Sequence, residues 1–156
     1  MVDRVDPART GVKAGRVVGL LTAGLAILSL VQARGSFHEA TAAIAGLVGV
    51  GSGLPVSALF WGNVVVAAST RYAVGYVVGS LVGVVYDWLD DPGVPGLVTI
   101  VLVVGAVDGA LAAIDTRSLA IGGAYVVAWL CYVPAFVWLF EDDGNARSGP
   151  RRLGES

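Results

Sequence analysis

The feature that most constrains this chain is the near absence of charge over 124 consecutive residues. Between Val17 and Phe140 the sequence has nine charged side chains, whereas the 32 residues of its two ends have 13. About a quarter of the residues of a soluble domain are charged, so a stretch this poor in charge is typical of a chain dissolved in lipid. We therefore expect a single membrane domain, 17–140, between an N-terminal tail, 1–16, and a disordered polar C-terminal tail, 141–156.

The fold class predicted for this domain is all-α, a polytopic transmembrane helical bundle. Hydrocarbon offers the backbone no hydrogen-bond partner, so each apolar segment must be a helix, and the strand alternation of a barrel is absent. A spanning helix takes about 20 residues, which leaves room for five spans with short loops and excludes six. The five predicted spans are 17–33, 40–69, 72–89, 96–114 and 118–140.

Basic residues predict how the chain lies in the cell membrane. Four of them precede the first span, so the positive-inside rule places the N-terminus in the cytoplasm. With five spans, Arg71 and Arg117 lie in cytoplasmic loops, Asp87, Asp90 and Asp91 lie outside, and the C-terminus is outside. Segment 17–33 also has the pattern of a cleaved secretory signal, but its basic region is long and further spans follow, which favours a retained span.

The second segment, 40–69, is too long for one straight span. Its 30 residues would make a helix of about 45 Å, against about 30 Å of hydrocarbon. Gly51, Gly53 and Pro55 cluster within it, and proline removes a backbone donor, so we expect a kink or break near 51–55. A broken helix can line a transport site, but a kink packed against neighbouring helices is the simpler interpretation.

Glycines recur at every fourth position in the third and fourth predicted spans. Such spacing puts bare backbone on one helix face, where close approach stabilises helix pairs in lipid. We expect the third and fourth helices to pack tightly through these faces, either within one chain or between copies. The residues concerned are Gly75, Gly79 and Gly83, and Gly105 and Gly109.

Asp108 is the one charged side chain that falls well inside a predicted span. An ionised group there costs about 2.5 to 3.5 kcal/mol, so Asp108 must be paired, protonated or in contact with water. Asn63 is the other deep polar group. Two interpretations stay open. One is a proton or cation site formed by Asp108, Asn63 and the broken backbone near Gly53, and the other is an interhelical hydrogen bond from Asp108 to Asn63, a serine or a tyrosine.

Enzyme signatures are missing from the sequence. No phosphate-binding loop, nucleophile elbow or zinc-protease motif occurs, and the single Cys and single His favour neither a metal site nor a cofactor. No basic block suggests nucleic acid. We expect a non-catalytic membrane protein that is self-associating or accessory, with the bilayer and a second copy or another membrane protein as partners. The alternative is a small proton- or cation-coupled transporter or channel that uses Asp108 and Asn63.

Overall fold

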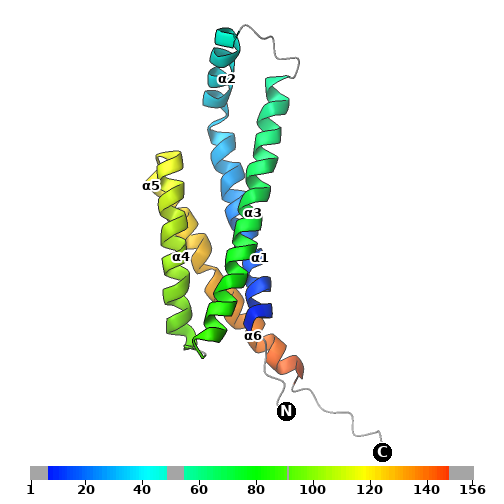
Figure 1. The fold of residues 1–156 in the computed structure, drawn as a ribbon, viewed down its shortest axis with the longest axis vertical. Helices are drawn as coiled ribbons and strands as arrows, with labels where there is room; N and C mark the ends of the chain where they lie inside the picture. The colour runs from blue at the N-terminus through cyan, green and yellow to red at the C-terminus, as the bar shows by residue number, and fades with distance from the viewer. Residues whose placement is uncertain (1–6, 49–54, 91, 148–156) are drawn as a thin grey trace, which may run out of the picture.

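The computed structural model describes residues 7–48, 55–90 and 92–147, and the regular structure in these ranges is entirely helical (Figure 1). This confirms the all-α class. The helices are α1 (Pro7–Gln32), α2 (Arg34–Val48), α3 (Val56–Trp88), α4 (Gly93–Thr116), α5 (Leu119–Leu130) and α6 (Tyr132–Arg147).

Among the described residues, four helical stretches are long and apolar enough to cross a membrane, so the prediction of five spans is wrong. They are Pro7–Gln32, Val56–Trp88, Gly93–Thr116 and Leu119–Glu141. The error lies in the second and third predicted spans. Thr70 and Arg71, which suggested a loop, lie inside the 33-residue helix α3. That helix is about 50 Å long, well above the thickness of hydrocarbon.

The segment 40–69 is not one span, because its two halves belong to α2 and α3. A break, one of the two forms expected near 51–55, separates the end of α2 at Val48 from the start of α3 at Val56. Pro55 immediately precedes α3 with an extended backbone (φ −62°, ψ 134°), a position at which its missing N–H disrupts no helical hydrogen bond. Gly51 and Gly53 lie outside the described residues. The end of α1 continues into α2, which lies beside the beginning of α3, where the rings of Phe37 and Phe60 are 5.5 Å apart.

Two antiparallel helix pairs make up the bundle: α1 with α3, and α4 with α5. Helix α6 continues the direction of α5 and crosses α1. The start of α1 and the end of α6 consequently lie at the same end of the bundle (Figure 1). Asp87 and Asp90, expected opposite the N-terminus, lie at this end too, because the C-terminal part of α3 packs on the first turns of α1.

The glycine ladder of α3 packs on α1 of the same chain, a partner that the spacing alone left open. Helix α1 has its own ladder with the same four-residue spacing, and the two interlock. The facing pairs are Gly11 with Gly83, Gly15 with Gly79, and Gly19 with Gly75. A Cβ atom added to Gly75 would lie 2.6 Å from the Cα atom of Gly19, closer than non-bonded carbons approach. The two backbones are therefore in direct contact over about two helical turns.

The glycines of α4 contact α5. A Cβ added to Gly105 would lie 2.9 Å from the Cβ of Trp129, and one added to Gly109 would lie 2.7 Å from the carbonyl oxygen of Gly122. The two helices are joined by a tight turn in which Arg117 adopts the left-handed conformation (φ 52°). Ser118 then caps α5 by accepting a hydrogen bond from the backbone N–H of Ile121. These local features place α4 and α5 side by side.

A proline separates α5 from α6. Pro134 has no N–H to donate to the carbonyl of Leu130, four residues earlier, and its ring crowds that carbonyl, so α5 ends at Leu130. The interruption is short, because Ala135 N–H still donates to the carbonyl of Cys131 at 3.4 Å. The buried side chains just after it, Tyr132 and Phe136, stack at 5.7 Å between ring centroids and form the centre of the core.

Candidate functional site

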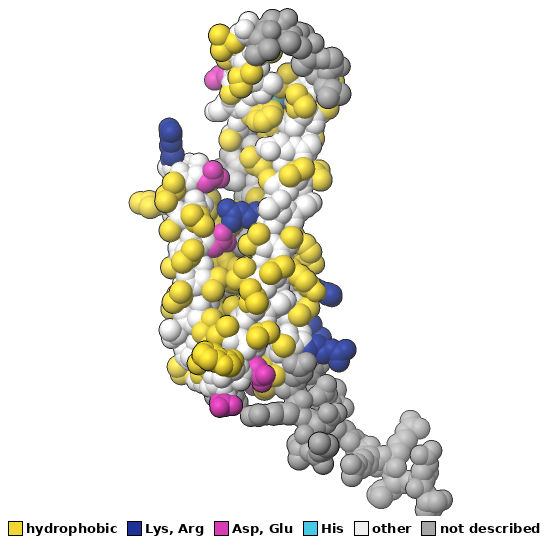
Figure 2. Space-filling view, in the orientation of Figure 1, with side chains coloured by type: hydrophobic (Ala, Val, Ile, Leu, Met, Phe, Trp, Pro, Cys, Tyr) yellow, Lys and Arg dark blue, Asp and Glu magenta, His cyan; other side chains and the backbone are white. Residues whose placement is uncertain are grey.

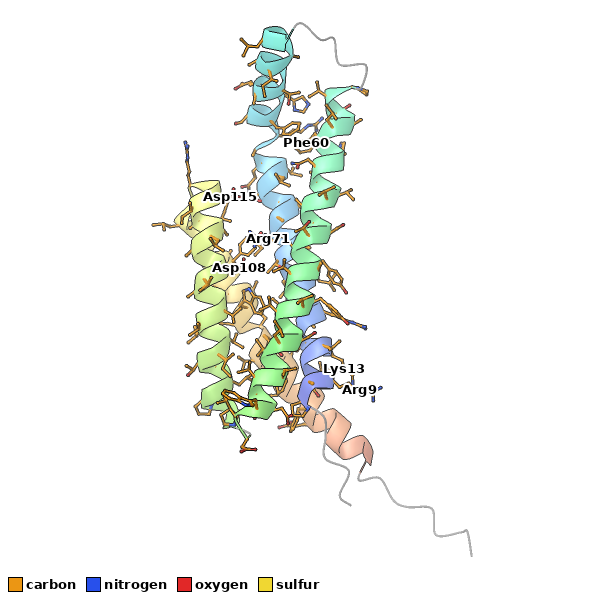
Figure 3. The ribbon with its side chains drawn as sticks, in the orientation of Figure 1. Arg9, Lys13, Phe60, Arg71, Asp108 and Asp115 are labelled. Atoms are coloured by element: carbon orange, nitrogen blue, oxygen red, sulfur yellow. The ribbon has the colours of Figure 1, made fainter. Side chains whose placement is uncertain are left out.

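An ion pair between the two helix pairs is the most distinctive polar feature of the bundle. The guanidinium of Arg71 on α3 donates a hydrogen bond to Oδ1 of Asp108 on α4, so the two opposite charges are in direct contact (Figure 3). Both side chains are largely enclosed, with exposed fractions of 26% for Arg71 and 15% for Asp108. The expectation that Arg71 lies in a loop is therefore wrong, and the intramembrane acid is paired.

Asp108 also accepts a hydrogen bond from a buried tryptophan. The indole Nε1 of Trp129 on α5 lies 3.0 Å from Oδ2 of Asp108. Trp129 is 1% exposed, so its ring is held by packing, including the contact with Gly105. Each carboxylate oxygen thus has a donor from a different helix. Satisfying both oxygens offsets the cost of placing this charge among apolar side chains.

Arg71 is held by an aromatic ring as well as by the carboxylate. Its guanidinium carbon lies 4.7 Å from the ring centroid of Tyr125, within the range of a cation–π interaction. The hydroxyl of Tyr125 donates to the backbone carbonyl of Thr22 on α1 at 3.4 Å. The site therefore connects α1, α3, α4 and α5 through one chain of polar contacts.

A second polar contact joins the same helix groups nearer the glycine ladders. The buried hydroxyl of Tyr132 donates to the carbonyl oxygen of Gly79 on α3 at 2.8 Å. Gly79 lies in the middle of the α1–α3 contact, and Tyr132 reaches its carbonyl from α6, the helix that continues α5. Together with Arg71 and Asp108, this contact fixes how the two pairs lie against each other.

A cavity of about 690 Å³ opens beside the ion pair. Its lining residues place it between the two helix pairs, near the turn that joins α4 and α5. Helix α2 and the first part of α3 extend beyond that turn (Figure 1). Arg71 and Tyr125 form part of the wall of the cavity, and Asp115 lies nearer the α4–α5 turn, two helical turns after Asp108 (Figure 3). Polar atoms of Ser29, Gln32 and Thr116 line it too.

The other predicted polar residue, Asn63, is not part of this site. It is exposed on α3, eight residues before Arg71 and therefore about 12 Å away along the helix. The partners of Asp108 are Arg71 and Trp129, so the structure does not bring Asp108 and Asn63 together. Pro55 lies farther still from Asp108, at the beginning of α3.

Sequence reasoning missed Arg71, Trp129 and Tyr125, although one signal could have found the arginine. Arg71 lies four residues before Gly75, so it continues the row formed by Gly75, Gly79 and Gly83 on a face that points inward. A cation is one partner that stabilises an acid within a span, and the stretch between Val17 and Phe140 has only three arginines and no lysine. Together, these two observations select Arg71.

The chemical character of the site is that of a neutral, mostly enclosed ion pair beside a polar cavity. Among the described residues, no group of three His, Cys, Asp or Glu side chains is close enough to hold a metal ion. Cys131 is a free thiol and is partly buried. Comparisons with protein-family models, with curated proteins and with solved structures found no match.

Proposed function

We propose that the chain is a non-catalytic membrane protein that spans the cell membrane four times and serves as a structural or accessory component of a membrane assembly. The observation that carries this proposal is that both carboxylate oxygens of Asp108 are hydrogen-bonded within the protein. Both of its oxygens accept hydrogen bonds, from Arg71 and from Trp129, so the acid buried in a described span links two helix pairs. Both oxygens are thus engaged within the protein, as expected for a structural link between helices.

The surface of the bundle supports a membrane setting. Hydrophobic side chains cover most of its length, and charged side chains gather mainly toward the ends, apart from a close basic and acidic group about halfway (Figure 2). Leu20, Val66 and Leu111 are each at least 60% exposed, although they belong to three different spanning helices. Such a surface is stable against lipid or against another membrane protein.

We further propose that both termini are cytoplasmic. Four spans bring the start of α1 and the end of α6 to the same side of the membrane. The basic residues of both terminal segments are then on one side when the positive-inside rule is applied. In sequence, the two terminal segments contain Arg4, Arg9, Lys13, Arg16, Arg147, Arg151 and Arg152. Toward the opposite end of the bundle the chain has Arg34 and Arg117. This excess is larger than the one that five spans give, and it favours the same cytoplasmic N-terminus.

A test of topology uses reporters on the two ends of the full chain. Alkaline phosphatase is active outside the cytoplasm and green fluorescent protein is fluorescent inside it. We expect fluorescent and phosphatase-negative fusions at both the N-terminus and the C-terminus. A phosphatase-positive C-terminal fusion with a fluorescent N-terminal fusion would return the chain to an odd number of spans and exclude this arrangement.

A test of function compares transport with complex formation. The protein is extracted from its native membrane in polymer-bounded lipid discs, and its partners are identified by mass spectrometry. In parallel, wild type and Asp108→Asn are reconstituted in liposomes, and proton and K⁺ flux are measured. We expect a fixed membrane-protein partner and no flux above empty liposomes. A flux in the wild type that Asp108→Asn abolishes without unfolding the bundle would replace the accessory role with transport.

The cavity beside Arg71 is the observation that favours the second candidate, a small transporter or channel. It reaches from one end of the bundle to the ion pair, as a half-open pathway would. Toward the opposite end, Tyr132 and Phe136 are at most 2% exposed and fill the core of the bundle. Transport would therefore need these aromatic side chains to move.

A further inference from the structure

The cavity beside the α4–α5 turn is the strongest candidate for a ligand site on this chain. Its volume of about 690 Å³ is in the range of pockets that hold small molecules. Four helices form its wall, so its shape depends on the same packing that holds Arg71 and Asp108 together. Ala26, Ala67 and Ala112 form apolar parts of the wall, and polar groups lie between them.

The charges around the cavity do not cancel. Three charged side chains lie at or next to it: Arg71, Asp108 and Asp115. Arg71 and Asp108 neutralise each other through their direct contact. Asp115 has no basic group of the described residues within ion-pair distance, although it lines the same cavity. The wall therefore has a net charge of −1, located on Asp115 and favourable to a single positive charge.

The hydroxyl groups of the wall are arranged to accept hydrogen bonds from a ligand. Ser29 donates its proton to the carbonyl of Ala26 at 3.0 Å, and Thr116 donates to the carbonyl of Ala112 at 2.7 Å. Tyr125 donates to the carbonyl of Thr22 at 3.4 Å. While these hydrogen bonds are kept, each hydroxyl oxygen offers lone pairs that can accept a hydrogen bond from a ligand. A ligand that pairs with them must bring N–H or O–H donors.

We propose that this cavity binds a small protonated amine, with Asp115 as its counter-ion. An ammonium group supplies the positive charge that Asp115 lacks and the N–H donors that Ser29, Thr116 and Tyr125 can accept. Its carbon skeleton lies against the alanines of the wall. An anion would be repelled by Asp115, and the guanidinium of Arg71 is already neutralised by Asp108. This proposal goes beyond the accessory function and holds for either candidate function.

The test measures equilibrium binding of three probes of one shape to the full chain in phosphatidylcholine nanodiscs at neutral pH. Cyclohexylamine is protonated, cyclohexanol is neutral and cyclohexanecarboxylate is anionic. Empty nanodiscs correct for partition into lipid. We expect saturable binding of cyclohexylamine, with the alcohol and the carboxylate at least about tenfold weaker. Binding of the alcohol or the carboxylate as tight as that of the amine, or no saturable binding of the amine, would overturn the proposal.

Variants locate the bound amine. Asp115→Asn removes the counter-ion, and because Asp115 is exposed, we expect an unchanged thermal midpoint with at least about tenfold weaker amine binding. Asp90→Asn, at the opposite end of the bundle, is the matched control and should bind like the wild type. Thr116→Val removes one acceptor and should weaken binding to a smaller degree. Unchanged binding by Asp115→Asn, or equal losses in Asp115→Asn and Asp90→Asn, would exclude this site.

Discussion

The contact between α1 and α3 and the contact between the two helix pairs hold the same bundle together by different means. Along α1 and α3, three glycine pairs bring backbone against backbone, with no side chain between them. Between the pairs, long side chains meet: Arg71 with Asp108, Trp129 with Asp108, and Tyr132 with the carbonyl of Gly79. The first contact depends on glycines, which have no side chain to keep the two backbones apart. The second contact depends on specific hydrogen bonds.

The difference determines which substitutions each contact tolerates. A backbone contact has no flexible part, so an added methyl group must push two helices apart. A polar contact can lose one hydrogen bond and keep its packing, and hydrogen bonds between membrane helices contribute only about 0.6 kcal/mol on average. We therefore expect the glycine contact to respond to added volume, and the polar contact to respond to lost donors and to unbalanced charge.

The largest effect is expected from Gly79→Leu. A Cβ atom at this position overlaps the Cα of Gly15, and a leucine adds three further carbons. Overpacking of this kind costs about 3 kcal/mol or more, equivalent to a thermal midpoint lowered by about 10 °C. The measurement is thermal unfolding in detergent. Gly62→Leu on the same helix is the control, because nothing lies within 4 Å of a Cβ added there. Equal midpoints for the two variants would refute the backbone contact.

A smaller loss is expected from Trp129→Phe. The substitution keeps an aromatic ring but removes the N–H that donates to Oδ2 of Asp108, so a mostly enclosed charged oxygen loses its partner. The expected cost is about 1 to 2 kcal/mol in the free energy of unfolding. Trp138→Phe, at a position 67% exposed, is the control and should be near neutral. If both variants lose the same stability, the indole hydrogen bond contributes nothing.

Tyr132→Phe tests the hydrogen bond that joins the two contacts. The lost hydroxyl donates to the carbonyl of Gly79 at 2.8 Å, and we expect a cost of about 1 kcal/mol. Tyr125→Phe removes a longer hydrogen bond, 3.4 Å to the carbonyl of Thr22, and should cost less. Denaturation in mixed micelles ranks the two variants. The opposite ranking would show that the distances do not report the strength of these bonds.

The smallest effect is expected from Arg117→Gly, which touches neither contact. Arg117 is exposed and holds the left-handed conformation at the end of α4, which glycine adopts without steric cost. The variant should be unchanged or more stable by about 0.5 kcal/mol. A large loss of stability would mean that the arginine side chain contributes to the bundle beyond its position in the turn.

The two contacts also differed in how far the sequence predicted them. The glycine ladder of α3 and its close packing follow from the four-residue spacing, because residues four apart share one helix face. The partner, however, depends on the ladder of α1, and Gly11 and Gly15 fell within the N-terminal segment that was expected to be a tail. The distribution of charge was enough to predict the all-α class, because lipid offers the backbone no hydrogen-bond partners and an apolar span must therefore be helical.

The polar contact was less accessible to sequence reasoning. Asp108 stood out because it lies within an apolar segment, but Arg71 and Trp129 are 37 and 21 residues from it. Arg71 beside Thr70 suggested a loop, since an arginine in a span is costly unless a partner is known. That one misplacement divided α3 into two spans and placed Asp87 and Asp90 at the wrong end. Which charges pair across helices depends on the tertiary packing, and local hydropathy cannot predict it.

The central claim is that Arg71 and Asp108 act as one structural link between the helix pairs, and a double-mutant cycle tests it most directly. The free energy of unfolding is measured in mixed micelles for the wild type, Arg71→Gln, Asp108→Asn and the double variant. Each single variant leaves one mostly enclosed charge without its partner, and we expect a cost of about 2 to 3 kcal/mol, below that of a fully buried pair. The double variant should cost less than the two single variants together, by at least about 1.5 kcal/mol. Additivity within about 0.5 kcal/mol would contradict the claim.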